Sequence, residues 1–238
     1  MKISDLKIQV YADGANISEI REVAKYSFIT GFTTNPSLLK RAGVTDYLEF
    51  AKQLVSEFPE KDISFEVFGT NDDEIFKEAE VLHNLGKNVF VKVPIMTTDG
   101  KPTGNIINKL SKMGINLNVT AVTTIDQVRY AENNLSKNTN NIISIFVGRV
   151  ADAGNDPDEF IKESVEITQN HPEANLLWAS TREVFNVIDA QKYGVDIITV
   201  PPALIQKLNV IGKTAEAISL DTVKGFERDI KSSGLTIL

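Results

Sequence analysis

A lysine interrupts the apolar run VFVKVPI at residues 89–95, where Lys92 lies between Val91 and Val93. A strand of this composition is typical of one that is buried on both faces, so we expect the Lys92 ammonium to be withdrawn from water. Burial disfavours the charged form of a lysine and lowers its pKa. A neutral amine can attack a carbonyl and form a Schiff base, and this position therefore predicts imine chemistry.

Polar side chains near the ends of the other apolar runs supply what a Schiff base needs. A protonated imine is an electron sink, so a neighbouring carbon–carbon bond can break if a base takes the departing hydroxyl proton. A second acid/base must remove and return the carbonyl water, and donors must hold the substrate hydroxyls. Nearly every run except the last contributes such a group: Asp13, Thr33, Asn35, Glu66, Asn118, Thr120, Ser144, Ser180 and, just beyond, Arg182.

Each of these residues also has a purely structural interpretation. A strand-end Asn, Ser or Thr often caps the next helix or completes a turn, and for Thr33 or Ser180 alone that is the favoured reading. Asp13 alone is compatible with a cap for a helix that begins near Asn16. A structural ion pair between Glu66 and Lys92 on adjacent strands is the main alternative to a catalytic lysine. That pair does not explain why so many further polar groups would converge on one cavity.

The elements that must position these residues follow from hydrophobic patterning. Helical spacing is predicted at 72–86, with Gly86 as C-cap, and at 156–169, with Asp156 as N-cap and Pro157 at the first helical position. A short helix at 219–230 is expected to cover one end of the fold. Between the helical segments, eight short β-branched runs are predicted as strands: 8–13, 28–35, 63–68, 89–95, 116–122, 142–148, 175–180 and 196–202.

Eight strands alternating with helices, at about 30 residues per unit, predict an α/β fold of the (β/α)8 barrel type, formed by one domain over residues 1–238. An open doubly wound sheet is the alternative, but it usually carries a glycine-rich phosphate loop after its first strand. Here the first strand ends YADGANIS, which lacks that fingerprint. In a barrel, catalytic groups project from the carboxyl ends of the strands, which is where these polar residues lie.

Composition narrows the classes of partner. The chain has 238 residues, no cysteine and a formal net charge of −7, with Lys and Arg scattered along it. Nucleic acid is a poor match for that charge, whereas a small anionic substrate fits if a few arginines gather in one cleft. Without cysteine, and with only His83 and His171, a metal site is poorly supported. We see no signal peptide and no membrane-spanning run, so a cytoplasmic protein is expected.

The motifs as a set identify a family. The chain resembles the transaldolase family over essentially its whole length, in a class I aldolase-like barrel. TTNPS and FVGR, in order around the VKVP lysine, are specific together, although each would be weak alone. The matching stretches are YADGAN (11–16), GFTTNPSLL (31–39), VFVKVP (89–94), NVTAV (118–122), SIFVGRV (144–150), ASTR (179–182) and ITVPPALI (198–205).

The resemblance implies a role for each candidate residue. Lys92 would form the Schiff base with a donor ketose, and Asp13 would act as acid/base at the C4 hydroxyl, where the C3–C4 bond breaks. Glu66 would work through a water that Thr120 positions, and no cofactor or metal would be needed. The remaining substrate-binding residues would be Asn35 and Asn118 at the dihydroxyacetone hydroxyls, Arg149 and Arg182 at the phosphate, and Thr33, Ser144, Phe146 and Ser180 in the cavity wall.

The implied reaction moves a dihydroxyacetone unit between sugar phosphates, from sedoheptulose 7-phosphate to glyceraldehyde 3-phosphate, in the pentose phosphate pathway. The related fructose 6-phosphate aldolases release free dihydroxyacetone, and typically carry Gln at the position of Glu66 and Tyr at that of Phe146, so both positions favour transfer. A sugar-phosphate-binding barrel without catalysis is a third possibility. The short chain resembles the compact subfamily, whose members often form ring-like oligomers through the C-terminal helix, so the resemblance implies a homo-oligomer. Two departures from the family pattern are the long polar segment 97–105 and Thr181 before Arg182.

Overall fold

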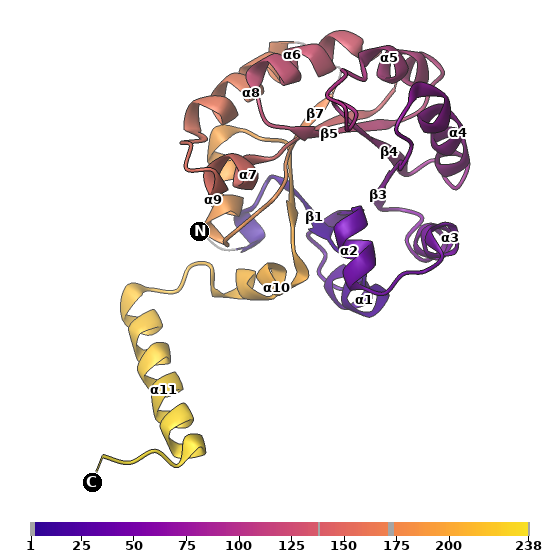
Figure 1. The fold of residues 1–238 in the computed structure, drawn as a ribbon. Coiled ribbons are helices and arrows are strands. Elements are labelled where there is room, and N and C mark those ends of the chain that lie inside the picture. The colour runs from indigo at the N-terminus through magenta and orange to yellow at the C-terminus, as the bar shows by residue number, and fades with distance from the viewer. Residues whose placement is uncertain (1–2, 138, 171–173, 238) are drawn as a thin grey trace.

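The computed structural model describes residues 3–137, 139–170 and 174–237 (Figure 1). Eight parallel strands follow one another around a closed barrel in chain order, and the eighth pairs back onto the first. This confirms the (β/α)8 prediction. The strands are β1 (Gln9–Asp13), β2 (Ile29–Thr33), β3 (Asp62–Glu66), β4 (Val89–Pro94), β5 (Leu117–Val122), β6 (Asn141–Ile145), β7 (Asn175–Trp178) and β8 (Ile197–Val200).

Helices surround the barrel, and those between two strands return the chain to the start of the next strand (Figure 1). Many begin at a short polar residue that accepts from the first free amides, as Asn16 accepts from Ser18 at 3.0 Å. The helices are α1 (Ile17–Ala24), α2 (Pro36–Arg41), α3 (Tyr47–Glu57), α4 (Asp72–His83), α5 (Gly104–Lys112), α6 (Ile125–Asn134), α7 (Val147–Asp152), α8 (Asp158–Asn170), α9 (Phe185–Tyr193), α10 (Pro202–Ile205) and α11 (Ala215–Ser233), with 3-10 turns at Ile3–Asp5 and Gln206–Val210.

Two predicted helix ends need correction. Helix α4 ends at His83 with Asn84 as its C-cap, so Gly86 is not the cap. Gly86 is instead a site of close approach, because a Cβ there would lie 2.8 Å from a methyl of Val55. Asp156 does accept a hydrogen bond from the amide of Asp158, at 3.0 Å, but the helix begins at Asp158, and Pro157 precedes it. In both cases hydrophobic spacing located the helix, while its end depends on local backbone contacts.

The barrel interior has an apolar lower layer and a polar upper layer. Tyr11, Phe90, Ile142, Leu177 and Ile197 pack together in the lower layer. A side chain at Gly31 would collide with the Tyr11 ring, since a Cβ there would lie 2.7 Å from it. The second, larger apolar core lies between the strands and the surrounding helices. Polar residues at the carboxyl ends of the strands therefore stand on a rigid, filled floor.

The C-terminal helix does not cover the barrel. Helix α11 spans Ala215–Ser233, longer than the predicted 219–230, and none of its residues is buried. Figure 1 shows it standing away from the barrel beyond α10, so the expectation that it covers a barrel end is wrong. An amphipathic stripe in a sequence predicts that a face will be covered, but it does not say by which surface. Among the described helices, none is long and apolar enough to cross a membrane.

Candidate active site

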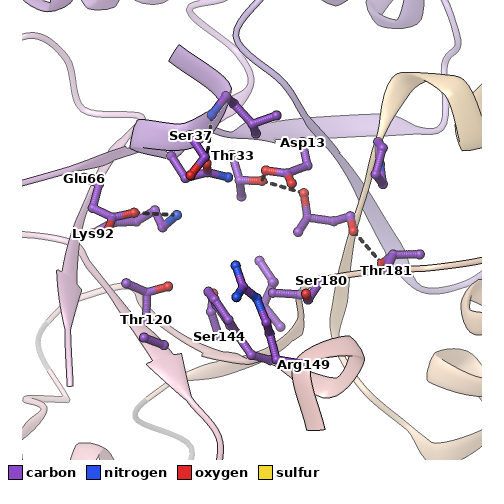
Figure 2. A pocket seen from close by; sticks show the side chains of 18 of the residues that line it. Asp13, Thr33, Ser37, Glu66, Lys92, Thr120, Ser144, Arg149, Ser180 and Thr181 are labelled. Atoms are coloured by element: carbon purple, nitrogen blue, oxygen red, sulfur yellow. Dashed lines mark hydrogen bonds and ion pairs between the residues drawn. The ribbon is translucent and has the colours of Figure 1, made fainter. Parts of the chain in front are cut away.

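A cavity of about 640 Å³ opens at the carboxyl ends of the strands. Eleven of the twelve residues predicted for the site line it, and Figure 2 shows many of them pointing toward a common centre. They come from seven strands and the segments that directly follow those strands, as expected for a barrel active site. The eleven are Asp13, Thr33, Asn35, Glu66, Lys92, Thr120, Ser144, Phe146, Arg149, Ser180 and Arg182.

Lys92 is buried, as its apolar neighbours predict, with 5% of its surface exposed. Strand register places it beside Glu66, and its Nζ lies 3.1 Å from Glu66 Oε2 (Figure 2). The same nitrogen donates to the backbone carbonyl of Thr34 at 2.7 Å. The structural ion pair considered above therefore exists, but it lies in the wall of the cavity. A carboxylate next to the nitrogen is also what carbonyl addition and dehydration require, so the pair and the chemistry are compatible.

Asp13 lies across the cavity from this pair. Its Oδ1 accepts from Thr33 Oγ1 at 2.8 Å, in keeping with the pairing of Asp13 with Thr33 in strand register. It does not cap α1, because Asn16 does so. Burial raises the pKa of Asp13 above its usual value, and Glu66 adds to that rise. The positive charges of Lys92 and Arg41 and the hydrogen bond from Thr33 oppose it, and the net shift is upward.

The two asparagines are placed differently. Asn35 lines the cavity, and it also caps α2 by accepting from the amide of Leu38 at 3.0 Å. Asn118 is fully buried and does not belong to the lining. Its amide donates to Ser64 Oγ at 3.0 Å and its Oδ1 accepts from Ser144 Oγ at 2.7 Å. In this structure Asn118 supports Ser144, which does face the cavity.

Strand β5 changes its course at the cavity wall. Its register with β6 shifts between Val119 and Val122, and Ala121 has a φ of 61°, which is uncommon for a residue with a side chain. Thr120 precedes this kink and lines the cavity, where its Oγ1 is buried and has no hydrogen-bond partner among the described residues. A buried hydroxyl without a partner is available to a bound molecule.

The two predicted phosphate-binding arginines differ in their surroundings. Arg182 pairs with Asp152, with Nε 3.1 Å from Oδ1, and its Nη1 donates to the Ser180 carbonyl at 2.9 Å. Arg149, from α7, points into the cavity, and within the described ranges no carboxylate lies within 4 Å of it (Figure 2). Ser180 has a φ of 67°, and a Cβ on Gly148 would come within 1.8 Å of its carbonyl oxygen. Close contact between the β6 and β7 ends thus holds both arginines near one wall.

Sequence reasoning missed five polar contributors to the site. The statement that the last strand lacks a polar residue is wrong, since Thr199 on β8 lines the cavity. Thr199 lies two residues after Ile197, which faces the barrel interior, so the strand period of two could have predicted that Thr199 also faces inward. Ser37 and Arg41 are four residues apart, a spacing that places both on one face of α2. The missed groups are the Thr34 carbonyl and the side chains of Ser37, Arg41, Thr181 and Thr199.

No group of three or more His, Cys, Asp and Glu residues in the described ranges is arranged to hold an ion. His171 lies outside the described residues.

Fold and site together define a (β/α)8 barrel with a buried lysine and two carboxyl groups around one cavity. The chain matches the family model Transaldolase/Fructose-6-phosphate aldolase over residues 10–237, and it belongs to that family. It is 36% identical to a probable transaldolase of Caldicellulosiruptor saccharolyticus over 203 residues, which are 84% of this chain and 89% of the relative. It is 31% identical to a probable transaldolase of a Thermoanaerobacter strain, over 97% of this chain and 100% of that one.

More distant solved structures share the fold. A 3-hexulose-6-phosphate synthase superposes with a TM-score of 0.59 at 15% identity, over 86% of this chain and 99% of the synthase. A structure titled native KDPGal superposes with a TM-score of 0.56 at 10% identity, over 97% and 100% of the two chains. At these identities the likeness supports the barrel architecture alone.

Proposed function

We propose that this protein is a transaldolase, which moves a dihydroxyacetone unit from a ketose phosphate to an aldose phosphate through a Schiff base on Lys92. The observation that carries the proposal is the position of Lys92. Its nitrogen is buried, faces a cavity of about 640 Å³ and lies 3.1 Å from Glu66 Oε2, with Asp13 on the same cavity wall as Thr33. A lysine with only a structural role would not need this set of acid/base groups around it.

In the proposed reaction the Lys92 amine adds to the C2 carbonyl of the donor ketose. Loss of the resulting hydroxyl as water needs a proton, and Glu66, with the unpartnered hydroxyl of Thr120 beside the same cavity, is placed to supply it. Asp13 takes the proton of the C4 hydroxyl, the C3–C4 bond breaks, and the electron pair passes into the iminium. The aldose leaves, and a second aldose accepts the carbon nucleophile by the reverse steps.

Two residues favour transfer over release of dihydroxyacetone. Transfer requires the carbon nucleophile to survive until an acceptor arrives, so nearby proton donors are harmful. Phe146 lines the cavity where a tyrosine hydroxyl would offer a proton. Glu66, held beside Lys92, fits the transaldolase pattern of the resemblance. Sedoheptulose 7-phosphate and glyceraldehyde 3-phosphate are the proposed substrates, within the pentose phosphate pathway. The cytoplasmic location stays a prediction that cell fractionation would test.

Borohydride trapping tests the proposed function. The protein is incubated with fructose 6-phosphate, reduced, digested and weighed by mass spectrometry. A dihydroxyacetone-sized addition on the Lys92 peptide is expected. Erythrose 4-phosphate added before the reduction should remove the bound unit from the protein as sedoheptulose 7-phosphate and so prevent the addition. Free dihydroxyacetone without acceptor would mean an aldolase. Binding of fructose 6-phosphate with no adduct at all would contradict both, and would leave a sugar-phosphate-binding barrel.

Arg149 is expected to bind the substrate phosphate, because it points into the cavity without a described carboxylate partner. Arg149→Met keeps the apolar stem and removes the charge-assisted hydrogen bonds, so KM for fructose 6-phosphate should rise by about 10- to 100-fold. KM for unphosphorylated fructose should change little. Arg129→Met is the matched control, since Arg129 pairs with Asp126 and Glu163 away from the cavity. Equal KM changes for both sugars would contradict a phosphate contact.

We propose a homo-oligomer that covers the apolar face of α11. This face comprises Leu220, Val223, Phe226 and Ile230, each more than half exposed. Four large apolar side chains on one stripe of a helix that contacts no core are typical of an interface. Inter-subunit contact through α11 is also what the resemblance to the compact transaldolases implies.

Phe226→Glu is expected to dissociate that oligomer, because it buries a charge in the proposed interface. Size-exclusion chromatography with light scattering should show a fall in mass toward the 26.3 kDa chain. Ser232→Glu adds the same charge on the opposite side of α11, at 100° per residue, and should leave the mass unchanged. A wild-type protein that already elutes as a monomer would refute the proposed assembly.

A further inference from the structure

The hydroxyl of Thr199 reaches the acid/base region from the last strand. Thr199 is 3% exposed and lines the cavity. Its Oγ1 lies 2.6 Å from Thr33 Oγ1. Strands β2 and β8 flank β1 on either side, so this contact crosses the inner face of β1 between the levels of Tyr11 and Asp13. Two hydroxyls from non-adjacent strands thus meet directly beside the Asp13 carboxyl group.

The chemistry of the partners fixes the direction of these hydrogen bonds. An ionised carboxylate only accepts, and a threonine hydroxyl has one hydrogen to donate. The Thr33 hydrogen therefore goes to Asp13 Oδ1, at 2.8 Å. The Thr33 oxygen must then accept, and Thr199 is the donor across the 2.6 Å contact. The result is a directed chain from Thr199 through Thr33 to Asp13.

Thr199 is held in place by its own backbone. Its carbonyl oxygen accepts from Thr181 Oγ1 at 2.7 Å, and Thr181 is itself buried. A protonated Asp13 could still accept from Thr33 at Oδ1, but a hydrogen bond to a carboxylate is stronger than one to a neutral carboxyl oxygen. The hydroxyls of Thr33 and Thr199 therefore favour the carboxylate form of Asp13.

We propose that Thr199 is a positioning residue for Asp13, acting through Thr33 to keep its carboxyl group ionised and aimed at the reacting hydroxyl. The inference rests on the proposed function, in which Asp13 must accept a proton. Burial and Glu66 raise the pKa of Asp13, while Lys92, Arg41 and the Thr33 hydrogen bond lower it. The chain of hydroxyls is among the contributions that lower the pKa of Asp13, and a substitution can remove it without changing any charge.

Thr199→Val tests this role, because valine matches the shape of threonine and lacks the hydroxyl. The acidic limb of kcat/KM for transfer should move up by roughly half a pH unit to one unit, since loss of a hydrogen bond shifts a coupled pKa by about that amount. We expect kcat near neutral pH to fall about tenfold. Thr199→Ser keeps the donor and should retain the wild-type profile. An unchanged limb in Thr199→Val would overturn the proposal.

A double variant separates positioning from a general structural effect. If Thr199 acts only through Thr33, Thr199→Val should shift the pH limb no further in a Thr33→Val background. Additive shifts would contradict the chain. Should Thr199→Val fold poorly, Thr199→Ala and Thr199→Ser form a second pair that differs only in the hydroxyl.

Failure of this proposal can be told from failure of the proposed function. Borohydride trapping of the wild-type protein on Lys92 does not depend on Thr199. Trapping with an unchanged pH limb would reject the role of Thr199 alone, whereas no trapping in the wild type would reject the function on which it rests.

Discussion

Lys92→Met is expected to lower the rate of transfer by at least about 1000-fold and to abolish the borohydride adduct. Methionine is similar in size to the lysine side chain but has no amine to form the imine. Steady-state assays with fructose 6-phosphate and erythrose 4-phosphate, together with intact mass after reduction, measure both effects. Lys92→Arg should be as inactive, since a guanidinium keeps the charge beside Glu66 but does not form an imine. Normal turnover by either variant would exclude the Schiff-base mechanism.

The same substitution has a consequence for stability. Lys92→Met leaves Glu66 partly buried without its partner, and we expect the free energy of unfolding to fall by about 1–3 kcal/mol, less than for a fully buried pair because Glu66 keeps some exposure. The double variant Lys92→Met/Glu66→Gln should recover most of that loss while remaining inactive. Chemical denaturation of the three proteins checks this. Recovery of stability without activity would separate the structural pair from the catalytic amine.

The sequence predicted the strands well because their signal is local. Runs of β-branched residues that alternate with helices at a regular interval favour a barrel, and period-two alternation then places polar strand-end residues on the inner face. Lys92 could be singled out because a buried charge inside an apolar run is usually either paired or functional. The pairing of Lys92 with Glu66 was likewise within reach, since the two lie on consecutive strands.

The parts that the sequence could not predict depend on contacts between distant segments. The hydrogen bond from Lys92 to the Thr34 carbonyl involves a backbone oxygen. Every residue has such an oxygen, so the sequence does not indicate which one Lys92 contacts. The Thr33–Thr199 contact joins residues 166 positions apart. The amide side chain of Asn118 is of a type that could bind a substrate hydroxyl, but it is already hydrogen-bonded to Ser64 and Ser144. No residue of α11 is buried, so this chain's own core does not explain the position of that helix.

Asp13→Asn should separate imine formation from bond cleavage. Asparagine Oδ1 can still accept from the Thr33 hydroxyl, so the fold and the geometry of that contact are retained. The variant lacks a base for the C4 hydroxyl, and transfer should fall by about 10²- to 10⁴-fold. Lys92 is untouched, so reduction with fructose 6-phosphate should trap an adduct of hexose-phosphate size in place of a dihydroxyacetone-sized one. A dihydroxyacetone-sized adduct formed at the wild-type rate would show that Asp13 is not the base.

Stability provides an independent check on Asp13. Because burial raises its pKa in the folded protein, the folded state holds its proton to higher pH than the unfolded chain does. The unfolding free energy contributed by this group is therefore highest below the unfolded pKa and falls as pH rises through the folded pKa. Asparagine does not titrate, so Asp13→Asn should match or exceed the wild type in melting temperature at neutral pH. If the variant were less stable at neutral pH, the ionised Asp13 carboxylate would stabilise the fold, which contradicts the expectation that its ionisation lowers the unfolding free energy.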